Sequence, residues 1–240
     1  MKSIGLTVLA ALAVAASASA DSVTMSYLGH GNPSTAGLRY NNRLTWSARS
    51  SATFSNVAIG SQQWSVYGQQ RTTFCVQLFE GVTAGNSYTY TILPPSQVPD
   101  MDAPVNAPGP MGPVKATLVN DLYRRYYAGL SGAQSVGAFQ LALWEITHEN
   151  IDARTASEAV TQLGLDRGAF QVNQLSGTYR TAASMLASLG EGGFGTMGTN
   201  LYGLTNPSAQ DQLMVVPIGA PAVLAGLGLI GVGLMRRRVK

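Results

Sequence analysis

The segment Thr72-Thr-Phe-Cys-Val-Gln-Leu-Phe79, followed shortly by Ser87-Tyr-Thr-Tyr-Thr-Ile92, decides which class of fold this 240-residue chain can adopt. Apolar and polar residues alternate with a period of two in both runs, which is typical of strands with one buried face. The residues between them, Gly81 to Asn86, favour a turn, so we expect the two runs to pair as a hairpin. Weaker alternation in Ser22–Tyr27 and Ala52–Val57 predicts further strands toward the N-terminus.

The period changes after a Pro-rich connection, Pro94–Pro113, which we expect to lie on the surface. Apolar residues then recur at helical spacing in Lys115–Leu130 and Ser135–Asn150, which predicts two amphipathic helices. A third helix is expected in Thr178–Leu189, and Gln212–Val216 resembles a closing strand. Together these patterns predict an α+β domain, an antiparallel β-sandwich or barrel with a packed helical subdomain.

Both ends of the chain carry targeting patterns. Residues 1–20 combine the basic Lys2, an apolar run and the small-residue site Ala18-Ser-Ala20, which is typical of a signal peptide. Ile218–Met235 has no charge and would span about 27 Å as a helix, enough to cross a membrane. The basic cluster that follows is a stop-transfer signal made of Arg236, Arg237 and Arg238. We therefore expect a signal peptide in 1–20, an extracytoplasmic domain in 21–215, and a sorting signal with a single transmembrane helix in 216–240.

The tail resembles the PEP-CTERM sorting signals of bacterial surface proteins. Its motif contains Val216, Pro217 and Pro221, lacks the usual Glu, and precedes the Gly/Ala/Leu-rich span and the Arg cluster. The resemblance implies a variant motif that is read by an exosortase-like processing enzyme. It also implies export through the inner membrane to the cell surface or extracellular matrix, with at least transient membrane anchoring by the C-terminus. A plain single-span anchor is the alternative.

The charge of the chain gives no sign of nucleic-acid binding. Five of its fifteen Lys and Arg residues lie in the two targeting segments, so ten basic residues face twelve acidic ones in between. The extracytoplasmic domain is therefore slightly acidic, without a basic patch. His148-Glu149 lacks the second His of a zinc helix, so we expect neither a metal site nor a cofactor.

One pair of residues could carry covalent chemistry. Cys75 is the only cysteine, so it cannot form an intramolecular disulfide, and an exported chain with an odd thiol requires an explanation. Gln140 lies on the apolar stripe of its expected helix together with Val136, Leu143 and Trp144. A buried amide is costly unless it is satisfied, and a covalent partner would satisfy it.

At these residues the chain resembles the Cys-Gln (TQXA) thioester domains of bacterial surface proteins. Phe74-Cys75 matches their aromatic-Cys strand motif, and Gln140-Leu-Ala-Leu-Trp144 matches their helical Gln-X-Ala motif, with Phe139 where the family has Thr. The resemblance implies a thioester between Cys75 and Gln140, shielded from water by Phe74, Phe139 and Trp144. Such a protein acylates an amine or hydroxyl of its target once, so it is an adhesin or cross-linker and not an enzyme.

Other interpretations of these residues stay open. Cys75 could be a buried structural cysteine with Gln140 bonded to backbone, and a Cys75–His148 protease pair is conceivable. Without a thioester, the chain would be a non-covalent structural or carbohydrate-binding protein of the extracellular matrix or biofilm.

Overall fold

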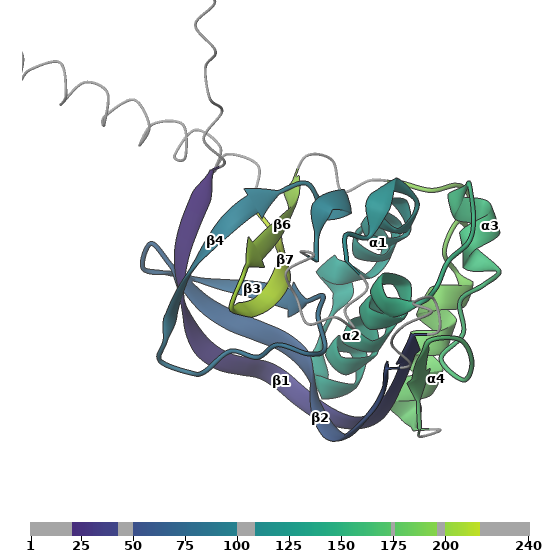
Figure 1. Cartoon of the computed structure of the whole chain (residues 1–240), viewed down its shortest axis with the longest axis horizontal. Coiled ribbons are helices and arrows are strands. Elements are labelled where there is room, and N and C mark those ends of the chain that lie inside the picture. The colour runs from purple at the N-terminus through teal and green to yellow at the C-terminus, as the bar shows by residue number, and fades with distance from the viewer. Residues whose placement is uncertain (1–20, 43–49, 100–108, 174–175, 196–199, 217–240) are drawn as a thin grey trace, which may run out of the picture.

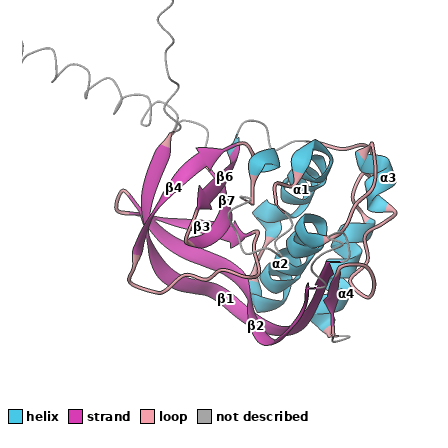
Figure 2. Cartoon of the chain, viewed as in Figure 1, coloured by secondary structure: helices cyan, strands magenta, loops and turns pink. Residues whose placement is uncertain are grey.

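The computed structural model describes residues 21–42, 50–99, 109–173, 176–195 and 200–216 of the chain (Figure 1). Within these ranges the fold is α+β, with a seven-stranded antiparallel sheet and four α-helices. The strands gather on one side of the molecule and the helices on the other (Figure 2). The predicted class, an antiparallel sheet with a packed helical part, is confirmed.

The sheet closes on itself through its two longest strands. Neighbouring strands follow the order β2-β3-β7-β6-β4-β1, and β1 also pairs with β2, while β5 extends the far half of β1. A closed ring leaves no unpaired strand edge along that part of the sheet. The bounds are β1 Ser22–Asn42, β2 Ser50–Val66, β3 Gln69–Cys75, β4 Ser87–Leu93, β5 Phe170–Val172, β6 Leu201–Asn206 and β7 Ala209–Val215.

The prediction that the two alternating runs pair as a hairpin is wrong. Its runs form β3 and β4, but β3 pairs with β2 and β7, and β4 pairs with β1 and β6. A tight turn at Tyr67 and Gly68, both with positive φ (50° and 75°), joins β2 to β3 and occupies one edge of β3. The C-terminal β7 takes the other edge, with Cys75 opposite Gln212. Alternation shows that a strand has a buried face, but it does not identify the neighbouring strand.

The three expected helices are present with slightly shifted ends, and a short fourth one was not expected. Their bounds are α1 Gly112–Tyr126, α2 Gly132–His148, α3 Ala156–Val160 and α4 Gly177–Ala187. The short α3 begins at a capping box in which Thr155 and Glu158 exchange side-chain and backbone hydrogen bonds. The Pro-rich connection is not wholly on the surface, because Val98 is fully buried and its carbonyl accepts a hydrogen bond from Met111 N.

Helix α2 is the centre of the molecule, which corrects the prediction that it is amphipathic. Every residue from Val136 to His148 is buried. One side of the helix packs against β1, β2 and β5, and α1 and α4 cover it elsewhere (Figure 1). A helix enclosed in this way has no solvent face, so polar residues on it need internal partners.

The segments that we expect to carry targeting signals fall largely outside the described residues. The expected signal peptide (1–20) and the expected sorting signal from Pro217 onward, with Pro221 and Arg236–Arg238, are not described, whereas Val216 is, with its N–H donating to Asn200 O at 2.8 Å. No helix in the described ranges is long and apolar enough to cross a membrane.

Candidate functional site

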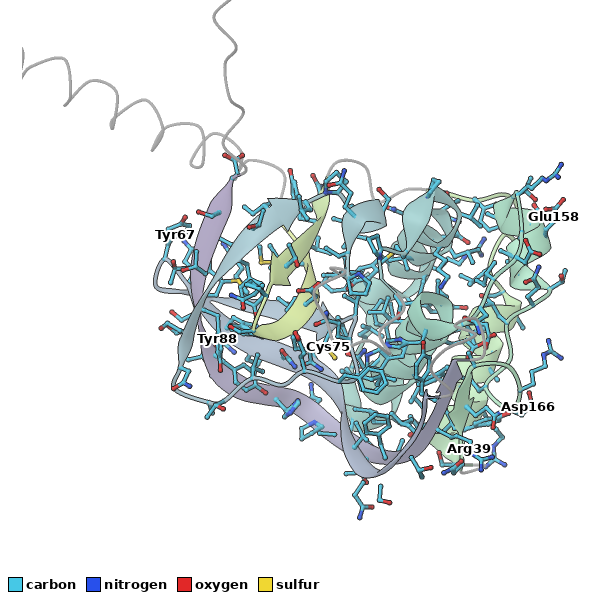
Figure 3. All side chains as sticks on the ribbon, viewed as in Figure 1. Arg39, Tyr67, Cys75, Tyr88, Glu158 and Asp166 are labelled. Carbon is cyan, nitrogen blue, oxygen red and sulfur yellow. The ribbon has the colours of Figure 1, made fainter. Side chains whose placement is uncertain are left out.

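The fold brings Cys75 and Gln140 together, although 65 positions separate them in the chain. Cys75 is the last residue of β3, and Gln140 lies midway along α2. The Gln140 Nε2 donates a hydrogen bond to the Cys75 carbonyl oxygen at 2.8 Å. Both residues are buried, Cys75 at 4% exposed and Gln140 at 0%. Cys75 lies at the boundary between the strands and the helices (Figure 3).

The Gln140 carboxamide is satisfied at only one end. Its nitrogen has the Cys75 carbonyl, but its Oε1 has no hydrogen-bond partner among the described residues. A fully buried carbonyl left in this state costs about 1–3 kcal/mol. The fold therefore tolerates an unfavourable polar group next to its only thiol.

The Cys75 thiol is free and shielded from water. Burial raises the pKa of the thiol, and the indole N–H of Trp144, which lies beside it, opposes that rise. This N–H makes no regular hydrogen bond in the described structure. At neutral pH the thiol keeps its proton, so it is a poor nucleophile toward external reagents.

A cavity of about 230 Å³ adjoins Cys75, whereas Gln140 does not line it. Strands β1, β2, β3 and β7, the loop after β3 and helix α2 all contribute to its wall, whose polar members are His30, Gln62, Cys75, Glu80, Trp144 and Gln210. Ligand pockets for drug-sized molecules usually measure about 300–1,000 Å³. This cavity is smaller and has room for about one extended side chain.

Of the three aromatic residues expected to shield the pair, only Trp144 lines this cavity. Phe74 and Phe139 contact each other with ring centroids 4.6 Å apart, and Tyr123 of α1 packs on both. Side chains alternate across a strand, which places Phe74 on the opposite face of β3 from Cys75. The two phenylalanines therefore anchor β3 to α1 and α2, and Tyr123 is a member of this cluster that the sequence did not indicate.

A network of buried glutamines, which the sequence did not indicate, includes Gln62 and Gln210 of the wall of the Cys75 cavity. Gln62 Nε2 donates to Gln210 Oε1 at 2.7 Å, and Gln210 Nε2 donates to the Gln77 carbonyl at 2.8 Å. The Gln77 side-chain oxygen in turn accepts from Asp211 N at 2.8 Å. The network fixes the orientation of the Gln62 amide and leaves its Oε1 without a partner in the described structure. Gln210 and Gln212, two positions apart on β7, were the available signal, because the period of a strand places both on one face.

A second group of buried ionisable residues lies at the C-terminal end of α2. Burial raises the pKa of Glu145 to about 8, although its Oε1 accepts from Gly164 N at 2.7 Å. Burial lowers the pKa of Lys115 to about 8, and its Nζ donates to the Thr147 carbonyl at 2.9 Å. The single lysine of residues 21–215 is thus partly buried and bonded to the backbone of α2.

His148 belongs to this group and not to the Cys75 site. Its Nδ1 lies 2.8 Å from Thr147 Oγ1 and 3.1 Å from the Trp144 carbonyl, and its ring packs on Tyr40 and Phe170. Burial lowers its pKa to about 3, so it is neutral at physiological pH. In the described ranges no three His, Cys, Asp or Glu residues are placed to hold a metal ion.

No protein-family model matches this chain, and neither a curated protein nor a solved structure matches it.

Proposed function

We propose that this protein is an exported, surface-held covalent adhesin or cross-linker whose reactive group is a thioester between Cys75 and Gln140. One observation carries the proposal: the fully buried Gln140 carboxamide donates to the Cys75 carbonyl at 2.8 Å. The unpartnered Gln140 Oε1 and the adjoining cavity support it.

Formation of the bond needs no other reactant. The Cys75 sulfur attacks the Gln140 carboxamide carbon, the C–N bond breaks, and the thiol proton leaves with the nitrogen as ammonia. Because the thiol is protonated, the intrinsic reaction is slow, and holding both groups in place is the main contribution of the fold. In well-oriented systems that contribution is about 7–11 kcal/mol of the barrier. The target nucleophile then displaces the sulfur and stays bonded to Gln140, so each molecule reacts once and is not a catalyst.

The proposal places this reactive domain outside the cytoplasm. A signal peptide in 1–20 exports the chain, and a variant PEP-CTERM tail in 216–240 holds it in the membrane until an exosortase-like enzyme processes it. Deleting Arg236–Lys240 should then release the protein from the membrane fraction. Recovery of the full chain from the cytosol with Met1 intact would contradict export.

Intact mass spectrometry tests the thioester. The protein should be lighter than its sequence by one ammonia, and methylamine should restore mass by adding to Gln140 while it frees the Cys75 thiol. Cys75→Ala and Gln140→Ala should both abolish the mass loss. Gln134→Ala is a matched control on the same helix, because the Gln134 amide is exposed and bonds to Thr181.

A different result would favour the non-covalent alternative. If the protein has its full sequence mass and methylamine adds nothing under native or mildly denaturing conditions, Cys75 is a structural cysteine. The chain would then be a structural or carbohydrate-binding matrix protein. Protection from alkylation alone decides nothing, since a buried thiol also resists it.

A further inference from the structure

The outer face of four neighbouring strands, in the order β4-β1-β2-β3, consists of hydroxyl and amide side chains. Val23, Met25 and Trp64 point into the closed sheet and are buried, so the residues that alternate with them point outward. These outward residues are exposed or half-exposed, and none of them carries a charge. We call this surface the hydroxyl face, and it comprises Ser87, Thr89 and Thr91 of β4, Ser22, Thr24 and Ser26 of β1, Gln63 and Ser65 of β2, and Gln70 and Thr72 of β3.

The register of the strands aligns these residues in rows. Ser26 lies opposite Ser87 on one side and opposite Ser65 on the other, and Ser65 lies opposite Gln70. One row therefore crosses all four strands, with a polar group about every 4.8 Å. The Oγ atoms of Ser26 and Ser87 lie 2.7 Å apart and share a hydrogen bond.

Hydrogen bonds within the hydroxyl face orient its groups without using all of them. Thr24 Oγ1 and Thr89 Oγ1 lie 2.9 Å apart, and Gln63 Oε1 accepts from Gln70 Nε2 at 3.0 Å and from Thr72 Oγ1 at 3.1 Å. Two hydroxyls that share one hydrogen bond keep one O–H and most of their lone pairs free. The face therefore presents donors and acceptors in fixed positions, which reduces the entropy lost when a ligand binds.

The large exposed apolar side chains of the described ranges, Leu28 and Tyr67, lie at the two ends of this face. Leu28 follows Ser26 by two positions on β1, and Tyr67 follows Ser65 by two positions in the turn after β2. Leu28 is 54% exposed and Tyr67 is 62% exposed. Figure 3 shows Tyr67 at the end of the molecule away from the helices.

The backbone conformation of Tyr67 is unfavourable for a tyrosine. Its φ is 50°, and the other non-glycine residues with positive φ in the described ranges are Asn32 and Asn56. Asn tolerates this region, whereas a bulky side chain rarely occupies it. Tyr67 is followed by Gly68, and a two-residue turn with positive φ at both positions favours Asn-Gly. An exposed ring kept at a strained position indicates a role in function and not in folding.

We propose that the hydroxyl face and Tyr67 form a binding site for a neutral polysaccharide. The hydroxyls of such a chain are both donors and acceptors, as are the groups of the face, and the flat ring of Tyr67 can cover the C–H groups of one sugar. This proposal does not rest on the thioester, because it uses neither Cys75 nor Gln140.

The composition of the face argues against other partners. Nucleic acids and anionic lipids are bound through Lys and Arg, which the hydroxyl face lacks. Protein interfaces are depleted in Ser, which is abundant here. Without a charge on the face, an anionic polymer gains no electrostatic attraction from it. A neutral polymer rich in hydroxyls is the partner that matches these residues.

Affinity electrophoresis of the full chain tests the site. Native gels that contain dextran, hydroxyethyl cellulose or galactomannan, which are neutral, are compared with gels that contain polygalacturonate, which is anionic. Relative to a non-binding standard of similar mass, at least one neutral polymer should retard the protein, and polygalacturonate should not.

Two variants connect the binding to this face. Tyr67→Asn should weaken binding about fivefold through loss of the ring, and the Asn-Gly turn should raise the melting temperature, so unfolding cannot explain the loss. Thr24→Val keeps the shape of the side chain, removes one hydroxyl and should weaken binding about threefold. Thr117→Val is the matched control, because Thr117 Oγ1 donates to Pro113 O on α1, outside the face.

Three results would overturn the proposal. The first is retardation by none of the neutral polymers, and the second is a Tyr67→Asn variant that binds as well as the unmodified protein. The third is a change of oligomeric state in both variants, measured by light scattering, which would show that the face joins copies of this chain. Binding should be reversible and leave the protein mass unchanged, so the mass test of the thioester succeeds or fails separately.

Discussion

Replacing Asp121 with Asn tests how α1 holds the glycine-rich loop of residues 190–195. The Asp121 side chain is fully buried. Its Oδ1 accepts from Arg124 Nη2 at 2.6 Å and Gly195 N at 3.1 Å, and its Oδ2 accepts from Arg125 Nε at 2.7 Å and Gly190 N at 2.9 Å. An asparagine has one oxygen, so its NH₂ group must face two of these donors in either orientation.

The loss of stability that we expect in Asp121→Asn follows from these contacts. Removing one partner of a buried ion pair usually costs about 3–5 kcal/mol. The Arg124 and Arg125 side chains are 40% and 16% exposed, so water can partly solvate them after the loss of the carboxylate. We therefore expect the free energy of unfolding to fall by about 3 kcal/mol, the lower end of that range.

The Asp121 carboxylate should also make the free energy of unfolding depend on pH. Burial alone would raise the pKa of Asp121, but hydrogen bonds from Gly190, Arg125, Arg124 and Gly195 outweigh it and hold the pKa at about 2, below its ordinary 3.8. The stabilisation is therefore complete above about pH 4 and is lost as the pH falls through 2. The difference in pKa corresponds to about 2 kcal/mol, and Asp121→Asn should lack this acid-dependent loss.

Urea denaturation monitored by tryptophan fluorescence at pH 7 and at several acidic pH values measures both effects. Asp166→Asn is the matched control, because Asp166 is exposed and a surface change of this kind should stay within about 0.5 kcal/mol (Figure 3). A loss below 1 kcal/mol at pH 7, or an equal acid-dependent loss in Asp121→Asn, would refute the role assigned to this carboxylate.

Two further changes test the buried acids on and after α2. Gly168→Ala should cost more than about 1 kcal/mol in thermal unfolding, because Gly168 has a φ of +77° and a Cβ would lie 2.0 Å from Glu149 Oε2. Gly81→Ala, with no atom within 4 Å of the new Cβ, is the control and should be close to neutral. Glu145 takes up a proton on folding between pH 4.5 and 8, so stability should fall as the pH rises through that window. Glu145→Gln should flatten this slope, and an unchanged slope in urea titrations would show that another group causes it.

Features that depend on neighbouring positions could be predicted from the sequence. The spacing of Leu118 and Leu122, and of Val136 and Phe139, predicted α1 and α2 because apolar residues recur in both segments with a period near 3.6. The alternation in Thr72–Phe79 likewise predicted β3. The proximity of Cys75 and Gln140, which the resemblance to thioester domains implied, also agrees with the structure, although it depends on a contact between residues 65 positions apart.

Features that depend on distant contacts could not be predicted in this way. The periodicity of β3 and β4 indicated a pair, but β2 and β7 flank β3, and β7 lies more than 130 positions away in the chain. The apolar stripe of α2 did not show that its other face is also covered, because that burial comes from α1 and α4. The glutamine network could not be predicted for the same reason. A glutamine in a sequence is usually exposed, and the partners that allow these glutamines to be buried lie far away in the chain.

The sequence by itself determined the α+β class and the positions of the longer helices, because each follows from residue type and local period, and the resemblance to thioester domains singled out Cys75 and Gln140. Only the tertiary structure decided the closed order of the strands, the separation of Phe74 and Phe139 from the cavity, and the meeting of Trp144, Gln62 and Glu80 around Cys75. These arrangements arise when segments far apart in the chain pack together. The free energy of that packing depends on contacts between segments, so the sequence of a single segment does not reveal it.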